Sequence, residues 1–102
     1  MRIVAKRRIG QWCIEYPDAA PSLKHWYSTA KRARWSSLQE VRASFPQADA
    51  AAVRSGKIVT IFNIKGNAYR LITAIHYNHE TIFLLMFLTH SDYSKGYWKG
   101  QL

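Results

Sequence analysis

Three apolar runs with the alternating character of β-strands fill most of the second half of the chain. The runs are IVTIFNI after Lys57, AYRLITAIHY after Asn67 and TIFLLMFLTH from Thr81. The segments between them, Lys65–Asn67 and Asn78–Glu80, are short and made of turn-forming residues. Strands joined by such short turns pair antiparallel with their neighbours, so we predict a C-terminal three-strand meander. Both faces of the runs are apolar, which predicts that the central strands are largely covered.

The first half of the chain has the 3.6-residue period of amphipathic helices. After a short strand in Met1–Ala5, residues 7–16 place a row of apolar side chains on one helical face. Pro17 ends this helix, and Asp18 is predicted to be the N-cap of a second one. That second helix buries an apolar face and turns its cations outward.

A third, short helix is predicted from a capping box, in which Ser37 opens the helix and Glu40 follows three residues later. Pro46 ends it, and Gln47–Gly56 is expected to be a loop of small residues. The predicted fold is therefore α+β and forms one domain of residues 1–102. It begins with a short N-terminal strand, and two to three helices pack on one face of an antiparallel sheet that includes the C-terminal meander.

The chain carries 15 Lys and Arg against 6 Asp and Glu, a net charge of +9. The excess is spread along the sequence and is not confined to a tail. Self-repulsion makes such a charge costly unless a polyanion or an acidic protein offsets it, so a nucleic acid is the favoured partner. A basic surface that serves solubility alone is the simpler alternative.

Several classes of function are not expected. No apolar stretch approaches the ~20 residues that span a bilayer, and the basic N-terminus lacks the apolar core of a signal peptide. We therefore expect a cytoplasmic protein without a membrane partner. Cys13 is the single cysteine, and His76 and His79 have no third ligand at a suitable spacing, so neither a metal site nor a cofactor is expected.

Arg70 stands out because it lies in the middle run of the meander. A guanidinium on an apolar strand is costly unless it is paired. It can bind a buried carboxylate, which would give it a structural role. It can equally face a concave surface and hold a phosphate through paired hydrogen bonds.

The last strand ends at His90, Asp92 and Tyr93, and a segment of cations and aromatic residues follows. Histidine titrates near neutral pH and can transfer protons, although a hydrogen-bonded structural role for His90 is also open. Asp92 can orient His90 or cap the next turn. Trp98 can stack on a base or close the core as a C-terminal plug.

The motifs together resemble the HigB family of type II toxin–antitoxin toxins, within the RelE-like superfamily. VTIFNIKGNAYRLI at residues 59–72, followed by a strand and LTHSDY, carries the resemblance in the second half. WCIEYPDAAPSLKHWYSTAKRARWSSLQEVRASFPQAD carries it in the first half. Where the family usually has an acidic residue after its T-H-x-x-Y segment, this chain has Ser94. If that acid orients the site, Ser94 implies less efficient cleavage, and if it only caps a turn, serine can replace it.

The resemblance implies the small RelE-like fold and a ribosome-dependent endoribonuclease that cleaves mRNA and inhibits translation. It also implies a HigA-type helix-turn-helix antitoxin that neutralises the toxin and through which the complex binds operator DNA. The expected chemistry is metal-independent attack of the 2′-OH on the phosphodiester. The expected catalytic residues are Arg70, His90 and Tyr93. The expected RNA-binding residues are Lys57, Lys65, Asn67, Lys95, Trp98 and Lys99.

A different class of function stays open at this point. A small basic α+β domain can dock on RNA or on the ribosome without any chemistry. His90 would then be structural, and the lysines and the C-terminal aromatic residues would form the binding surface.

Overall fold

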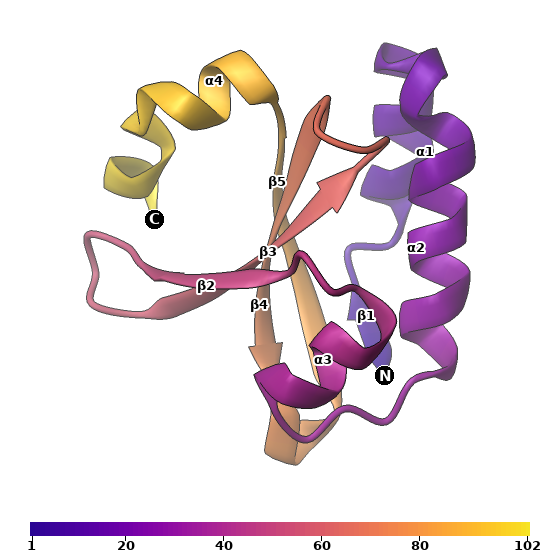
Figure 1. Cartoon of the computed structure of the whole chain (residues 1–102), viewed down its shortest axis with the longest axis vertical. Helices are drawn as coiled ribbons and strands as arrows, with labels where there is room; N and C mark the ends of the chain where they lie inside the picture. The colour runs from indigo at the N-terminus through magenta and orange to yellow at the C-terminus, as the bar shows by residue number, and fades with distance from the viewer.

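A computed structural model describes all of residues 1–102 (Figure 1). The strands are β1 (Arg2–Val4), β2 (Asp49–Ala52), β3 (Ile58–Ile64), β4 (Tyr69–His76) and β5 (Thr81–Thr89). The α-helices are α1 (Arg7–Glu15), α2 (Ala20–Arg32), α3 (Leu38–Ser44) and α4 (His90–Lys95). Short 3₁₀-helices lie at Pro17–Ala19, Tyr77–His79 and Tyr97–Gln101. None of the helices is long and apolar enough to cross a bilayer.

The five strands form one sheet in the order β1-β5-β4-β3-β2. The predicted meander of β3, β4 and β5 is confirmed, and its pairs are antiparallel. β1 pairs parallel with β5, which places the N-terminus beside the last strand. β4 is the central strand, so Tyr69 and Arg70 at its start lie between β3 and the end of β5.

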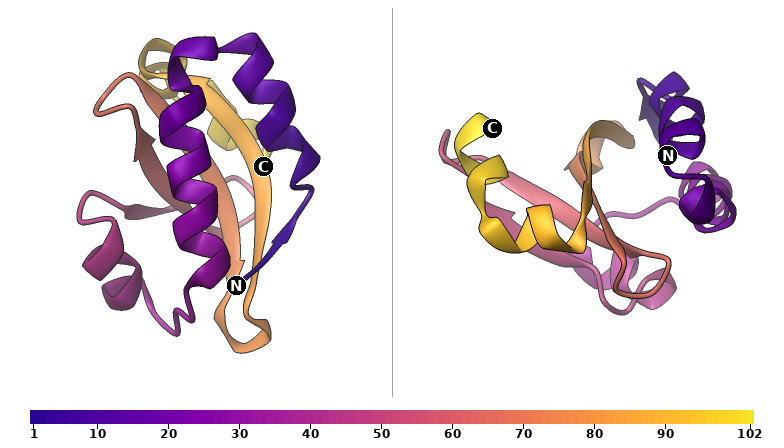
Figure 2. Two further views of the ribbon diagram at one scale, coloured as in Figure 1. Left: turned by 90° about the vertical axis from the view of Figure 1, so that its right-hand side faces the viewer. Right: turned by 90° about the horizontal axis from the view of Figure 1, so that it is seen from above.

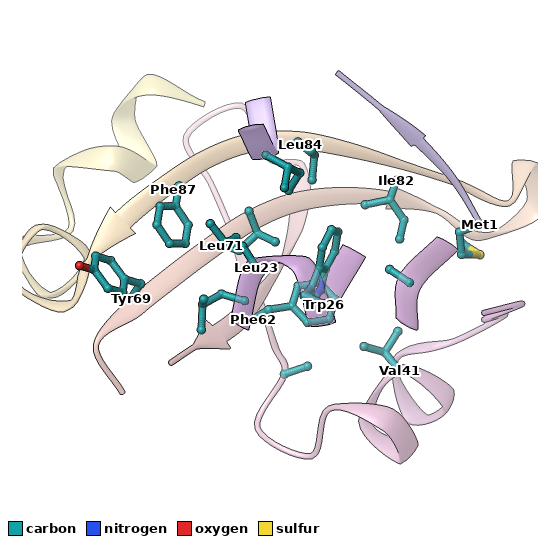
Figure 3. Close-up of a cluster of buried hydrophobic side chains, with 14 of the residues drawn as sticks. Met1, Leu23, Trp26, Val41, Phe62, Tyr69, Leu71, Ile82, Leu84 and Phe87 are labelled. Atoms are coloured by element: carbon teal, nitrogen blue, oxygen red, sulfur yellow. The ribbon is translucent and has the colours of Figure 1, made fainter. Parts of the chain in front are cut away.

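The α-helices of the first half cover one face of this sheet, as predicted (Figure 2). Leu23, Trp26 and Ala30 of α2 are fully buried against Phe62, Leu71 and Ile82 of the strands (Figure 3). These side chains recur at i, i+3 and i+7, which is the spacing of one helical face. The apolar periodicity therefore determines which side of α2 meets the sheet.

The opposite face of the sheet is partly covered by the C-terminal segment, α4 and the following turn (Figure 2). Trp98 is 3% exposed and packs in a second cluster with Val53, Val59, Ile61 and Ile72. This is the predicted C-terminal plug, because the indole closes an apolar cluster. Stacking of Trp98 on RNA is not compatible with this burial.

Two local predictions are wrong. Asp49–Ala52, expected to be part of a loop, is the edge strand β2 and pairs antiparallel with β3. Its alanines gave no β-type pattern, and only pairing with β3 makes it a strand. Asp18 is not the N-cap of α2, because a 3₁₀ turn comes first and Ala19 occupies that position without a side-chain cap.

The predicted capping of α3 is confirmed in part. The Ser37 hydroxyl accepts a hydrogen bond from the Glu40 amide. The Glu40 carboxylate reaches back one residue further than expected, to the amide and hydroxyl of Ser36. These hydrogen bonds lower the pKa of Glu40.

Candidate active site

The candidate site lies at one end of the central strands, where β3 turns into β4 and β5 leads into α4 (Figure 1). We call this the turn edge, formed by the turn Lys65–Ala68, the start of β4 and residues Thr89–Tyr93. Tyr69 is paired with Thr89 across β4 and β5, and Arg70 is paired with Leu88. Antiparallel pairing thus brings the middle-strand arginine and the last-strand histidine, 20 residues apart in sequence, to the same end of the sheet.

Arg70 is 8% exposed and points to the face of the sheet that α4 covers. Its Nη1 donates to the carbonyl oxygens of Asn67 and Tyr69, at 3.1 Å each, and its Nη2 donates to the side-chain oxygen of Asn67. No carboxylate lies within ion-pair distance of the guanidinium. The carboxylate partner that would have made Arg70 purely structural is absent, so its positive charge is held by neutral oxygens.

His90 is the first residue of α4 and is exposed. Its amide donates to the carbonyl of Ala68 at 2.9 Å, which attaches the start of α4 to the β3–β4 turn. Arg70 binds Asn67 of the same turn, so the two candidate residues are connected through consecutive turn residues. The His90 imidazole has no hydrogen bond within the protein.

The side chains after His90 have the following roles. Thr89 caps α4, since its hydroxyl accepts from the Asp92 amide at 3.2 Å. The Asp92 carboxylate faces Lys95 at 3.8 Å and makes no hydrogen bond to His90. The Ser94 hydroxyl donates to the His90 carbonyl at 2.8 Å. Ser94 therefore makes a local contact within α4.

Tyr93 links the arginine to the C-terminal plug. Its ring lies 5.1 Å from the Arg70 Cζ and stacks on Trp98 with 5.5 Å between centroids. A ring over a guanidinium is attracted through its quadrupole and restricts the guanidinium's orientation. Tyr93 therefore helps to hold the Arg70 guanidinium in place.

The predicted RNA-binding lysines do not form one cluster. Lys65 lies in the turn and Lys95 ends α4, while Lys99 lies 5.7 Å from the Trp98 ring. Lys57 precedes β3 and is at the opposite end of that strand from Lys65. Among these lysines, Lys65 is paired with Asp18 in the turn, and only Lys95 and Lys99 lie in the C-terminal segment.

Sequence reasoning missed a polar network on the other side of the turn. The Asp18 carboxylate accepts hydrogen bonds from the Tyr69 hydroxyl, at 2.8 and 3.0 Å, and from Lys65 Nζ at 3.0 Å. The bonds from Tyr69 and then Lys65 lower the pKa of Asp18. The bond to Asp18 raises the pKa of Tyr69. No local pattern shows this contact, because Asp18 and Tyr69 are 51 residues apart.

None of the five best-defined cavities is lined by Arg70, His90 or Tyr93. The largest of the five, of about 570 Å³, is an apolar groove on the face of the sheet that carries the C-terminal segment. Its lining residues include Val59, Ala74 and Phe83. Two smaller cavities touch the turn on its helix side, where they are lined by Lys65 and by Gly66. No group of three or more His, Cys, Asp or Glu side chains could hold a metal ion.

Two comparisons with known proteins bear on this surface. The family described as the HigB toxin, a RelE-like toxic component of a toxin–antitoxin system, matches residues 19–96. An mRNA interferase HigB of Escherichia coli O6:H1 is 27% identical over 95 residues, which cover 93% of this chain and 90% of that protein. The matched region includes the turn edge and every candidate catalytic residue.

Proposed function

Because the chain belongs to the HigB family of RelE-like toxins, we propose that it is an endoribonuclease that cuts mRNA on the ribosome and so inhibits translation. The relative's name, mRNA interferase, supports RNA cleavage as the toxic activity. The observation that carries the proposal is the guanidinium of Arg70, which has no carboxylate partner and lies beside the turn that holds His90. A net charge of +9 supports an RNA substrate.

The proposed reaction needs no metal. The ribose 2′-OH attacks the adjacent phosphorus while the neutral His90 imidazole takes the 2′ proton. Arg70 stabilises the negative charge of the phosphorane by hydrogen bonding and charge. The bond from phosphorus to the 5′ oxygen breaks, and that oxygen takes a proton from a solvent water as it leaves, while the proton held by His90 is later released to solvent. The products are a 2′,3′-cyclic phosphate and a 5′-OH, and Tyr93 orients Arg70 through the reaction.

The exposed position of His90 supports dependence on the ribosome. An exposed His90 binds a flexible RNA strand poorly on its own. If the ribosome holds the strand in place, orientation supplies much of the barrier reduction and a modest site is sufficient. Lys57, Lys65, Lys95 and Lys99 would contact phosphates, and Asn67 would bind the RNA beside Arg70. Trp98 is not kept in this set, because its ring packs in the C-terminal apolar cluster and its Nε1 already donates to the Tyr93 carbonyl.

The partner we propose is a HigA-type helix-turn-helix antitoxin, and the complex would bind operator DNA through that antitoxin. Membership of a toxin–antitoxin family supports an antitoxin, and the positive charge suits an acidic protein surface. A small helix-turn-helix reading frame beside the gene would identify it. Co-expression of that product should restore growth.

The test is to incubate the purified protein with translating ribosomes and to map mRNA 5′ ends. We expect codon-linked cut sites from the wild type, and losses of at least about 100-fold in Arg70→Ala and His90→Ala. His79→Ala, an exposed histidine at the other end of β5, is the control and should cut normally. Inhibition of translation without new 5′ ends would instead establish a non-catalytic ribosome-binding module. Full activity of both site variants would remove the assigned residues.

A further inference from the structure

The β3–β4 turn, Lys65–Ala68, is exposed at all four positions, yet three polar contacts of the site depend on where it lies. The Asn67 carbonyl and side chain bind the Arg70 guanidinium. The Ala68 carbonyl accepts the His90 amide. Lys65 and Gly66 both have positive φ, 54° and 63°, which closes the turn tightly. An exposed turn has no apolar packing of its own, so its position is set by the Ile64–Tyr69 pair that closes the hairpin and by polar contacts.

Asp18 provides such contacts at both ends of this turn. Lys65 precedes Gly66 and Tyr69 follows Ala68, and both donate to the one carboxylate. The Tyr69 ring is itself fixed, since it stacks on Phe87 with centroids 5.1 Å apart and meets the Tyr16 ring edge-on at 5.2 Å. The bond from Tyr69 thus joins the core to Asp18, and the bond from Lys65 extends that connection to the turn.

We infer that Asp18 is a positioning residue, which acts through the turn to place Asn67, and through Asn67 the guanidinium of Arg70. This inference rests on the proposed nuclease function, because its consequence is for the phosphate held by Arg70. Asp18 itself lies on the helix side of the sheet and Arg70 on the opposite side, so Asp18 does not touch the reacting atoms. Asp18 lies in the 3₁₀ turn Pro17–Ala19 and does not cap α2, so its carboxylate is available to accept from Tyr69 and Lys65.

The decisive variant is Asp18→Asn, which keeps the size of the side chain and removes its charge and one acceptor oxygen. We expect its kcat for ribosome-bound mRNA to fall by between about 10-fold and 100-fold, because the turn and Arg70 are then less well aligned. The KM for ribosomes should stay within about twofold, since the contacts of substrate binding are still present. Asp18→Glu should recover part of the loss.

The matched control is Asp49→Asn. Asp49 is another exposed carboxylate in an ion pair, 3.3 Å from Arg42, and it lies on the edge strand β2. It should retain wild-type kcat. Equal kcat for Asp18→Asn and Asp49→Asn would overturn the inference, and so would a loss confined to KM, which would make Asp18 and Lys65 part of RNA binding only.

Two further measurements cover the remaining outcomes. If Asp18→Asn does not fold, Tyr69→Phe removes only the hydroxyl and should lower kcat in the same direction, and an unchanged kcat would overturn the inference. The Arg70 Nε–Hε resonance in ¹⁵N NMR spectra should shift in Asp18→Asn and not in Asp49→Asn. The NMR measurement does not need RNA cleavage. If the wild type cuts no mRNA but the Arg70 resonance still shifts in Asp18→Asn, the nuclease function is rejected and the positioning role of Asp18 stands. An unmoved resonance would reject the positioning role.

Discussion

The guanidinium of Arg70 lies against the aromatic ring of Tyr93, with Cζ 5.1 Å from the ring centroid. The same ring stacks on Trp98, which is buried in the C-terminal cluster. Arg70 is thus held by the turn through Asn67 and by the C-terminal segment through Tyr93. Its orientation depends on two parts of the chain that follow different strands.

This relationship predicts that the ring of Tyr93 matters more than its hydroxyl. Tyr93→Phe keeps the contact with Arg70 and Trp98 and should cut mRNA within about tenfold of the wild-type rate. Tyr93→Leu loses the aromatic face and should cut at least about tenfold more slowly than Tyr93→Phe. Initial rates on programmed ribosomes measure both. A Phe variant as slow as His90→Ala would instead make the hydroxyl a proton-transfer group.

A second prediction concerns the helix-facing core. Leu71 is fully buried on the central strand, so Leu71→Ala should lower the free energy of unfolding by about 2–5 kcal/mol. The comparison is Ile58→Ala on β3, whose side chain is 62% exposed and should cost about 0.5 kcal/mol or less. Urea unfolding followed by tryptophan fluorescence gives both values. Similar losses for the two variants would show that burial in this sheet does not govern stability.

Much of the architecture follows from local patterns. The period of two residues in β3, β4 and β5, and the short turns between them, are sufficient to predict the meander. The face of α2 that meets the sheet follows from the spacing of Leu23, Trp26 and Ala30. These elements could be predicted because the residues that determine them are neighbours in sequence.

The features that were missed depend on contacts distant in sequence. β2 has no strand pattern and exists because β3 offers it a free edge. The parallel pairing of β1 with β5 joins residues near opposite ends of the chain. Asp18 looked like a helix cap because that is its usual local role, and only the fold brings Tyr69 and Lys65 to it. Residue types did suggest Arg70 and His90 as candidates. Only the fold shows that both bind the same turn, Arg70 through Asn67 and His90 through Ala68.

A third prediction concerns pH. The folded state lowers the pKa of Asp18 below its ordinary value of 3.8, mainly through the bond from Tyr69. The stabilisation it gives is therefore present above about pH 4 and is lost as the pH falls through the lower, folded-state pKa. The folded state raises the pKa of Tyr69 above its ordinary value of 10.0, so the same bond is present below pH 10 and is lost at higher pH.

Melting temperatures of the wild type and Asp18→Asn, measured from pH 2 to pH 11, test this linkage. We expect the difference between them to be largest between about pH 4 and pH 10 and to shrink outside that range. Asp49→Asn serves as the control, because Asp49 accepts from Arg42 and from the amide of Ala50 and has no contact with the turn. A difference that stays constant across the whole range would show that the charge of Asp18 does not contribute to stability.

The last prediction concerns the cations of the C-terminal segment. Lys95 lies 3.8 Å from Asp92 on an exposed helix, and Lys24 is exposed on α2, on the far side of the sheet. If Lys95 neutralises an RNA phosphate, Lys95→Ala should weaken ribosome binding at low salt. It should also lower the slope of log K against log salt by about one, because one fewer counterion is released. Lys24→Ala should change neither quantity, since Lys24 lies on α2, on the other face of the sheet from the C-terminal segment. Sedimentation binding at several salt concentrations gives the slopes, and equal slopes for the two variants would place the RNA on another surface of the molecule.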